Sequence, residues 1–346
     1  METRIKHKNI PFFIPHSGCG HSCVFCNQVK ITGHHLCESD VKEEVARLES
    51  LVESSLETIG EAKAEIGFFG GSFTGIEHER REALLKAAYR YVKSGKVAGI
   101  RLSTRPDYIS NEILDELEFY GVTAVELGIQ STDNEVLEAS ARGHRAEVCF
   151  EAARLITERS IEFAGQMMVG LPRSDLEKEL KTAADIVSMG AVSARIYPTV
   201  VFEGTELYRM TVGGAYTPLS LEDAVERSAK CLSVFENAGV RILRIGLHSS
   251  DNLKQAPFGA NHPAIGEAVY SRAVLHNIEE QLSEFKDGSF VNKVLKIYTS
   301  FDGVSAAAGH KGENKQKLKE KYGFKKIKVF GENGLQRRKV RIEVEG

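Results

Sequence analysis

Three cysteines lie close together near the start of the sequence. Cys19, Cys23 and Cys26 form a CxxxCxxC pattern in a chain of 346 residues that has six cysteines in all. Thiolate sulfurs suit iron–sulfur clusters, and three of them can hold three irons of a [4Fe–4S] cube. The fourth iron then stays open for a substrate or a cofactor, so the spacing predicts a cluster with one reactive corner.

Zinc is an alternative occupant for the same thiols. Structural zinc usually has four protein ligands. Five nearby side chains could each supply the fourth ligand: His16, His21, His34, His35 and Cys37. This segment alone therefore leaves zinc open, and it also leaves open three purely structural thiols. The more distant Cys149 and Cys231 are isolated, which is typical of small buried hydrophobic residues.

The elements that must position these thiols show in the pattern of apolar residues. Over the first two hundred residues, short apolar runs alternate with longer amphipathic segments. The expected strands are 11–15, 65–69, 98–102, 122–129, 161–169 and 192–197. The expected helices are 40–56, 78–94, 111–120, 147–158 and 174–189, and Ser110 and Ser174 are expected as N-caps. Repeated strand–helix units predict a parallel sheet, either doubly wound or curled into a barrel.

The segments that follow the strands favour one of these two sheets. Each expected strand is followed by polar or glycine-rich residues. A barrel presents such residues at the end of every strand, whereas a doubly wound sheet concentrates them at one switch point. We therefore expect an α/β fold, a partial (β/α)6 TIM-like barrel with a C-terminal α+β extension.

The regular alternation stops after Thr199. A loop is expected at 202–219, a helix at 221–237 and a strand at 240–245, before a last region that mixes loop and helix. This change of pattern divides the chain into three expected regions. They are the barrel (1–200), an extension of the core (201–246) and a separate C-terminal region (247–346).

Basic residues are concentrated at the carboxyl end of the sequence. Residues 310–346 contain twelve Lys or Arg and five acidic residues, a net charge of +7, whereas the whole chain carries −3. Such an excess is typical of a surface that binds a polyanion. A solvated amphipathic helix followed by a pair of strands explains the same composition equally well.

The composition argues against a membrane-spanning or secreted protein. The chain is 42% hydrophobic and 27% charged, and it has no window of about 18 uncharged apolar residues. Its first thirty residues lack the apolar stretch of a secretory signal, so we expect a cytoplasmic protein with no membrane partner. In that reducing compartment, clustered thiols are more often ligands than disulfides.

The cysteine pattern, with Phe25 before its last cysteine and a strand expected ahead of it, resembles the radical S-adenosylmethionine (SAM) superfamily. The resemblance implies a barrel of the radical SAM type and a [4Fe–4S] cluster held by Cys19, Cys23 and Cys26. It also implies that the methionine moiety of SAM chelates the open iron. Reductive cleavage of SAM to a 5′-deoxyadenosyl radical would then need an electron donor such as flavodoxin or ferredoxin.

Several motifs at strand ends resemble SAM-binding positions of that superfamily. Gly70-Gly71-Ser72 resembles the glycine-rich segment that binds the methionine amino group, with Ser72 where Glu is frequent. A likeness to oxygen-independent coproporphyrinogen oxidase implies contacts from Gln130 to the ribose and from Arg142 to the methionine carboxylate. Ser103 and Gln166 stand where that enzyme has acidic residues. The implied SAM-binding residues are Gly70, Gly71, Ser72, Ser103, Gln130, Arg142 and Gln166.

A longer stretch, roughly residues 10 to 245, resembles the catalytic subunit of Elongator. The likeness rests on residues 105–108, 142–144, 195–208, 214–219 and 240–244. That family modifies the wobble uridine of tRNA with acetyl-CoA and carries a C-terminal acetyltransferase domain, which the residues after Arg244 do not resemble. The likeness implies a radical SAM enzyme that acts on RNA, most simply tRNA. The alternatives are a radical SAM enzyme for a small molecule such as a porphyrin, and a non-catalytic iron–sulfur or zinc protein.

Overall fold

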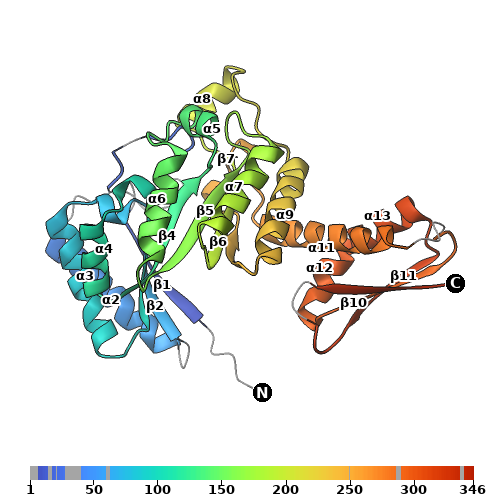
Figure 1. Ribbon diagram of the computed structural model, residues 1–346, viewed down its shortest axis with the longest axis horizontal. Coiled ribbons are helices and arrows are strands. Elements are labelled where there is room, and N and C mark those ends of the chain that lie inside the picture. The colour runs from blue at the N-terminus through green and yellow to red at the C-terminus, as the bar shows by residue number, and fades with distance from the viewer. Residues whose placement is uncertain are drawn as a thin grey trace.

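A curled parallel sheet forms the larger part of the molecule (Figure 1). The computed structural model describes residues 7–14, 18–20, 22–27, 40–59, 63–248, 250–285, 290–335 and 339–346. The seven strands of the sheet are β1 (His7–Phe13), β2 (Lys63–Phe69), β3 (Gly99–Thr104), β4 (Val122–Gln130), β5 (Glu162–Val169), β6 (Ser193–Pro198) and β8 (Arg241–Ile245). They lie in the order β1–β2–β3–β4–β5–β6–β8, so the order in space follows the order in the chain. The prediction of a partial barrel rather than a doubly wound sheet is confirmed.

Helices cover the outer side of this sheet (Figure 1). They are α2 (Val41–Ile59), α3 (His78–Lys93), α4 (Asn111–Phe119), α5 (Asn134–Ala139), α6 (Ala146–Thr157), α7 (Leu176–Ser188) and α9 (Leu221–Asn237). Their apolar faces and the strands share one core, in which Leu84, Ile156 and Phe163 are almost completely buried. The short 3-10 turns η1 (Phe73–Gly75) and η2 (Pro106–Tyr108) follow β2 and β3.

The predicted elements of the barrel all occur, with shifted ends. The first strand differs most, because it runs from His7 to Phe13 rather than over 11–15, and residue 15 lies outside the described residues. Ser110 caps α4, as predicted, and accepts a hydrogen bond from the Ile113 N–H. The prediction for α7 was wrong by one residue: Asp175, not Ser174, is its N-cap and accepts from the Lys178 N–H at 2.9 Å.

One prediction beyond residue 199 needs correction, and another is confirmed. The loop expected at 202–219 contains the helix α8 (Glu206–Val212), which Thr205 caps. Before it, the short strand β7 (Val200–Val201) pairs with β9 (Phe258–Gly259). The strand expected at 240–245 is β8, and it pairs in parallel with β6. The sheet therefore has a seventh strand, supplied by a segment that lies outside the regular alternation.

The last part of the chain forms a second, smaller body, the C-terminal lobe (residues 265–346). The short α10 (Asp251–Lys254) precedes the long α11 (Ile265–Ser283), whose first turns pack on the barrel and whose later turns enter a separate apolar core. The helices α12 (Val304–Ala308) and α13 (Glu313–Tyr322) share that core. Figure 1 shows the lobe extending from the barrel along α11.

A three-stranded sheet completes the C-terminal lobe. Its central strand β10 (Val294–Thr299) lies parallel to β11 (Lys326–Gly331) and antiparallel to β12 (Val340–Glu345). Short turns, η3 (Phe301–Gly303) and η4 (His310–Gly312), connect the elements. In the part of the chain that the structure describes, no helix is both long and apolar enough to span a membrane.

Candidate active site in the barrel cavity

A cavity of about 950 Å³ opens inside the curled sheet, and every strand of that sheet contributes to its lining. The three predicted cluster ligands, Cys19, Cys23 and Cys26, line it. Six of the predicted SAM-binding residues line the same cavity: Gly70, Gly71, Ser103, Gln130, Arg142 and Gln166. Residues from six separate segments of the chain therefore meet at one place, as expected for strand ends of a barrel.

The cysteine segment is attached to the barrel by backbone hydrogen bonds. The Val24 N–H donates to the Ser140 carbonyl at 3.2 Å, and the Val24 carbonyl accepts from Leu207 in α8 at 2.8 Å. Gly18, with a φ of +74°, approaches Ser72 so closely that a Cβ would overlap the Ser72 carbonyl oxygen. This position therefore requires glycine.

The thiols themselves differ in burial. Cys23 is buried, Cys19 is exposed, and Cys26 is intermediate. Among the described residues, no three Cys, His, Asp or Glu side chains are already gathered around one metal position. The alternative zinc ligands lie outside the described residues: His16, His21, His34, His35 and Cys37. The ligand set of the cluster therefore stays a prediction.

Two arginines approach the sulfur of Cys23. Nη1 of Arg142 lies 3.2 Å from this sulfur and Nη1 of Arg105 lies 3.7 Å from it. Although Cys19 as a whole residue is exposed, partial burial of its thiol group raises the pKa of that thiol, while the charges of Arg105 and Arg142 act in the opposite direction. Because guanidinium groups stabilise nearby thiolates, this corner suits an anionic thiolate cluster.

The strand β4 ends in a distortion that directs Gln130 towards this corner. The register with β5 shifts between Gly128 and Gln130, and Gln130 has a φ of +66°, which is uncommon for a residue with a side chain. Its buried Oε1 has no hydrogen-bond partner among the described residues, and neither has the buried Nε of Arg142. Strained backbone and unsatisfied buried polar atoms occur together at binding sites, where a ligand completes them.

Ser72 is the predicted residue that does not line the cavity. Its side chain is fully buried, its hydroxyl lies 2.8 Å from the Thr104 hydroxyl, and it accepts a hydrogen bond from the Arg105 N–H at 3.1 Å. Arg105 is also bound by Asp107, at 2.9 and 2.8 Å. Ser72 therefore positions Arg105, which in turn faces the cysteines.

An ion-pair network on the inner face of the sheet was missed at the sequence level. Glu126 is completely buried and accepts two hydrogen bonds from Arg195, at 2.6 and 3.1 Å. Arg101 lies 3.4 Å from the same carboxylate. Gln166 donates to Glu126 and to Ser103, each at 3.1 Å, so the network also fixes both predicted residues. Charged residues within otherwise apolar strands were the signal that could have found it.

Arg244 on β8 carries a charge that this network does not neutralise. It lies next to Arg195 in the register of β6 and β8 and donates to the carbonyls of Gly246 and Leu247, at 2.9 and 3.0 Å. No carboxylate pairs with Arg244 within the described part of the chain. Burial lowers its pKa, and Arg195 adds to that effect. This end of the cavity is therefore suited to an anionic group.

Residues 13–186 match the Radical SAM superfamily, and residues 192–281 match the Radical_SAM C-terminal domain. The chain belongs to the radical SAM superfamily. The cofactors of these enzymes are a [4Fe–4S] cluster and SAM, and the cavity fits them through its soft sulfur donors, its two arginines and its unsatisfied Gln130 and Arg142 atoms.

Relatives with a similar sequence include a tRNA uridine(34) acetyltransferase and an Elongator complex protein 3. The tRNA uridine(34) acetyltransferase of Methanocaldococcus jannaschii is 33% identical over 181 residues, which are 51% of this chain and 33% of that protein. Human Elongator complex protein 3 is 28% identical over 192 residues, 50% of this chain and 35% of that protein. The match thus spans about a third of the length of these relatives.

A solved structure shares the fold of this radical SAM chain. Archaeal Elp3 of Methanocaldococcus infernus superimposes with a TM-score of 0.61 at 24% identity, over 80% of this chain and 63% of that chain. The predicted resemblance to the radical SAM core of the Elongator catalytic subunit is confirmed at the level of family and fold.

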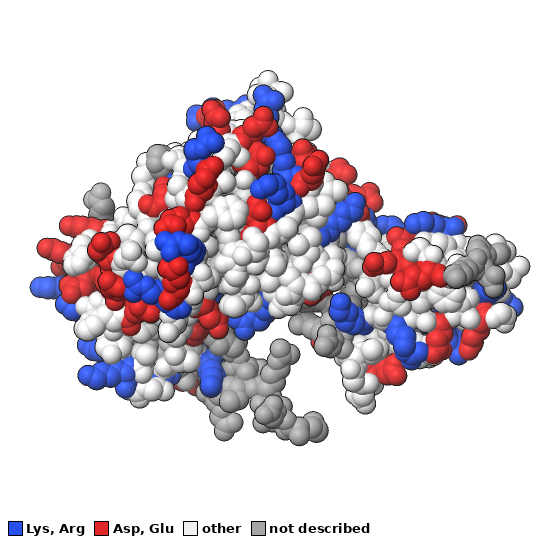
Figure 2. Space-filling view, in the orientation of Figure 1, with Lys and Arg blue, Asp and Glu red and all other residues white. Residues whose placement is uncertain are grey.

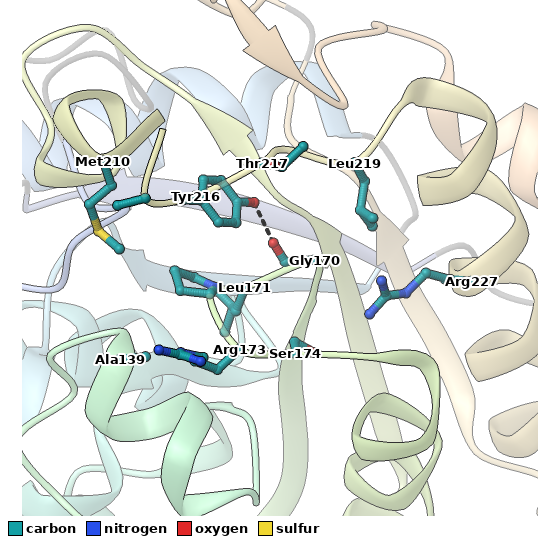
Figure 3. A pocket seen from close by; sticks show the side chains of 12 residues that line it. Ala139, Gly170, Leu171, Arg173, Ser174, Met210, Tyr216, Thr217, Leu219 and Arg227 are labelled. Carbon is teal, nitrogen blue, oxygen red and sulfur yellow. Dashed lines mark hydrogen bonds between the residues drawn. The ribbon is translucent and has the colours of Figure 1, made fainter. Parts of the chain in front are cut away.

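A second cavity, of about 620 Å³, lies outside the sheet (Figure 3). None of the predicted site residues lines it. The Tyr216 hydroxyl donates to the Gly170 carbonyl at 2.5 Å, and Arg227 is bound to the buried Glu179, which also accepts from the Gly170 N–H at 2.6 Å. Tyr216 and the Glu179–Arg227 pair thus hold the turn after β5.

Proposed function

We propose that this radical SAM enzyme holds its [4Fe–4S] cluster through Cys19, Cys23 and Cys26 and acts on RNA, most simply tRNA. The observation that carries the proposal is the convergence of these thiols, Arg142 and Gln130 on one cavity. The three thiolates would hold the cluster, and the chemistry it would supply is the reductive cleavage of SAM bound beside it. A cytoplasmic flavodoxin or ferredoxin is the natural source of the electron for that cleavage.

The residues around the thiols have separate tasks in this proposal. Arg142 pairs with the carboxylate of SAM, because a guanidinium with an unsatisfied buried Nε gains a charge-assisted hydrogen bond there. Gln130 offers its unsatisfied amide oxygen to a ribose hydroxyl. The backbone of Gly70 and Gly71 receives the methionine amino group. Ser72 acts indirectly, because its hydroxyl accepts a hydrogen bond from Arg105 and so positions that residue.

The ion-pair network around Glu126, on the inner face of the sheet, fixes two of the predicted SAM-binding side chains. Gln166 and Ser103 are held by Glu126, whose negative charge is shared between Arg101 and Arg195. Fixed partners of this kind reduce the reorganisation that binding requires. We assign Ser103 and Gln166 to the polar contacts of SAM for this reason.

An anionic substrate suits the remaining end of the cavity, where Arg244 lies without a carboxylate partner among the described residues. RNA brings a phosphate to that position, and the names of the relatives support a tRNA substrate. A small anionic molecule such as a porphyrin is the second candidate, because its carboxylates can also pair with Arg244.

The test is formation of 5′-deoxyadenosine by anaerobically prepared enzyme after reduction with dithionite. We expect slow formation from SAM alone and faster formation when unmodified tRNA is added. Stimulation by a porphyrinogen and not by tRNA would replace RNA with the second candidate. Absence of cleavage under every condition would contradict the proposed cofactor site.

Arg142→Ala tests the SAM contacts directly. We expect its affinity for SAM to fall by about 1.5–3 kcal/mol, because a hydrogen bond between charged groups is lost. Arg145→Ala is the matched control, because Arg145 lies in the same connection between α5 and α6 but its side chain is largely exposed. Calorimetric titration with SAM measures both variants, and an unchanged affinity in Arg142→Ala would remove Arg142 from the site.

A further inference from the structure

The sheet of the C-terminal lobe has two unlike faces. Residues that alternate along its strands, among them Leu295, Ile297, Ile327 and Val340, are buried in the core of the lobe. The helices α11, α12 and α13 pack on that side, and Figure 1 shows α11 and α13 above the sheet. The opposite face, called here the outer face, is formed by Lys296, Tyr298, Lys326, Lys328, Phe330, Arg341, Glu343 and Glu345.

Two aromatic rings and a guanidinium form a column across the outer face. Tyr298 on β10 has Phe330 of β11 on one side and Arg341 of β12 on the other. The two rings are stacked, with centroids 5.3 Å apart and planes inclined by 23°, and the Arg341 guanidinium lies 4.1 Å from the Tyr298 centroid. Phe330 ends the column on β11 and is 39% exposed. The column thus offers an aromatic surface to a further planar group.

The charges on this face are unevenly balanced. On the β12 side, Arg341 pairs with Glu332 at 3.1 Å and with Glu343, and Lys296 pairs with Glu345. On the β11 side, Lys326 and Lys328 have no ion-pair partner among the residues that the structure describes. Figure 2 shows blue side chains along the lower edge of the lobe, with red ones between them. The uncompensated positive charge therefore lies on the same strand as Phe330.

We propose that the outer face binds a single-stranded segment of RNA, with an unpaired base stacked on Phe330 and the adjoining phosphates at Lys326 and Lys328. Aromatic side chains stack on bases of any sequence, but a base inside a duplex has both faces covered. Lysines at alternate positions of one strand lie about 6.6 Å apart and can contact successive parts of one backbone. This inference rests on the RNA substrate proposed above and adds a second place of contact, outside the cavity.

The experiment measures binding of fluorescently labelled oligoadenylate, as a single strand and as a duplex with oligouridylate, to the full chain. We expect Phe330→Ala to weaken single-strand binding at least about fivefold, the lower limit of base stacking, and Phe330→Tyr to retain the affinity. The double variant Lys326→Gln with Lys328→Gln should reduce the slope of log affinity against log salt by about 1.4 units, or about 0.7 for each phosphate contact of a single strand.

A matched pair of lysines distinguishes this face from general positive charge. Lys315→Gln with Lys319→Gln makes the same change of charge on α13, which packs on the other side of the sheet, and should leave the slope and the affinity unchanged. An equal loss in both double variants would overturn the proposal. So would undiminished binding by Phe330→Ala, equal affinity for the duplex, or no binding by the unaltered protein.

The result is separable from that for the proposed function. If tRNA stimulates SAM cleavage while Phe330→Ala binds oligoadenylate normally, the outer face is overturned and the RNA substrate stands. Point substitutions are needed because a chain ended at Ala308 would lose α13, β11 and β12, which build the core of the lobe. Thermal unfolding of Phe330→Ala checks that the lobe stays folded.

Discussion

The barrel cavity and the outer face of the C-terminal sheet use ion pairs in opposite ways. In the cavity, Glu126 is completely buried and the side chains of its partners Arg101 and Arg195 are 3% and 12% exposed, so a lost contact would leave a charge that is largely shielded from water. On the outer face, Arg341 and Glu343 are about 45% exposed, and a pair of that kind contributes little to stability. The buried pairs thus fix side chains inside the cavity, whereas the exposed pairs contribute little to holding the outer face.

The largest expected effect is a loss of iron from the barrel that leaves the C-terminal lobe unchanged. Cys23→Ala should abolish the brown colour that an iron–sulfur cluster gives to the protein, and it should remove about four irons per chain. The reason is the loss of the buried sulfur next to Arg105 and Arg142. The C-terminal lobe should remain unaffected, so binding of oligoadenylate should persist. Iron analysis and absorption spectra of anaerobically prepared protein measure the first effect.

Cys149→Ala is the control for this loss. Cys149 is completely buried in the barrel core, and its burial raises the pKa of its thiol to about 12. Such a thiol is inert as a ligand, so iron content should stay unchanged in this variant. A Cys23→Ala protein that retains its iron, or an unaltered protein that is colourless and holds one zinc, would contradict the proposed ligand set.

A smaller effect tests whether the two cores are independent. Phe324→Ala removes a ring that is buried among Phe290 and Tyr322 in the lobe, and a change of this kind costs about 3–5 kcal/mol. We expect faster amide hydrogen exchange in β10, β11 and β12, with the strands of the barrel still protected.

Phe163→Ala in the barrel core is the corresponding change on the other side of the comparison. It should speed amide hydrogen exchange in the strands around β5, while the strands of the lobe stay protected from exchange. Loss of protection in both regions in either variant would show that α11 couples them into one cooperative unit, and the comparison between two separate bodies would fail.

The barrel was predictable from the sequence because its signals are local. Alternating apolar runs and amphipathic segments, caps such as Ser110 and the CxxxCxxC spacing each lie within a few residues. The helix α8 was missed because the loop around it has no long apolar period. The predicted boundaries at residues 200 and 246 stay predictions.

The lobe and the ion-pair network were not predictable in the same way. The strands β10 and β12 pair although 40 residues separate Thr299 from Val340 along the chain, and no local pattern specifies that register. Glu126 and Arg195 are 69 residues apart and meet only because β4, β5 and β6 are neighbours in the sheet. Ser72 was assigned to SAM from its neighbours in sequence, but Thr104 and Arg105 engage its hydroxyl.

The smallest expected effect concerns how helices begin in the two regions. In the barrel, α4, α5, α7 and α9 start with a side-chain cap, and in α7 the Asp175 carboxylate accepts from the Lys178 N–H. The barrel helices α3 and α6 start without one, as do α11, α12 and α13 of the lobe. Asp175→Ala should lower the free energy of unfolding of the barrel by about 1 kcal/mol, as measured by denaturant titration. Asp175→Asn should retain most of the stability, because an amide oxygen also caps. Equal losses in both variants would assign the effect to the negative charge near the helix N-terminus, and no loss in either would mean that packing against β5 and α9 alone holds α7 in place.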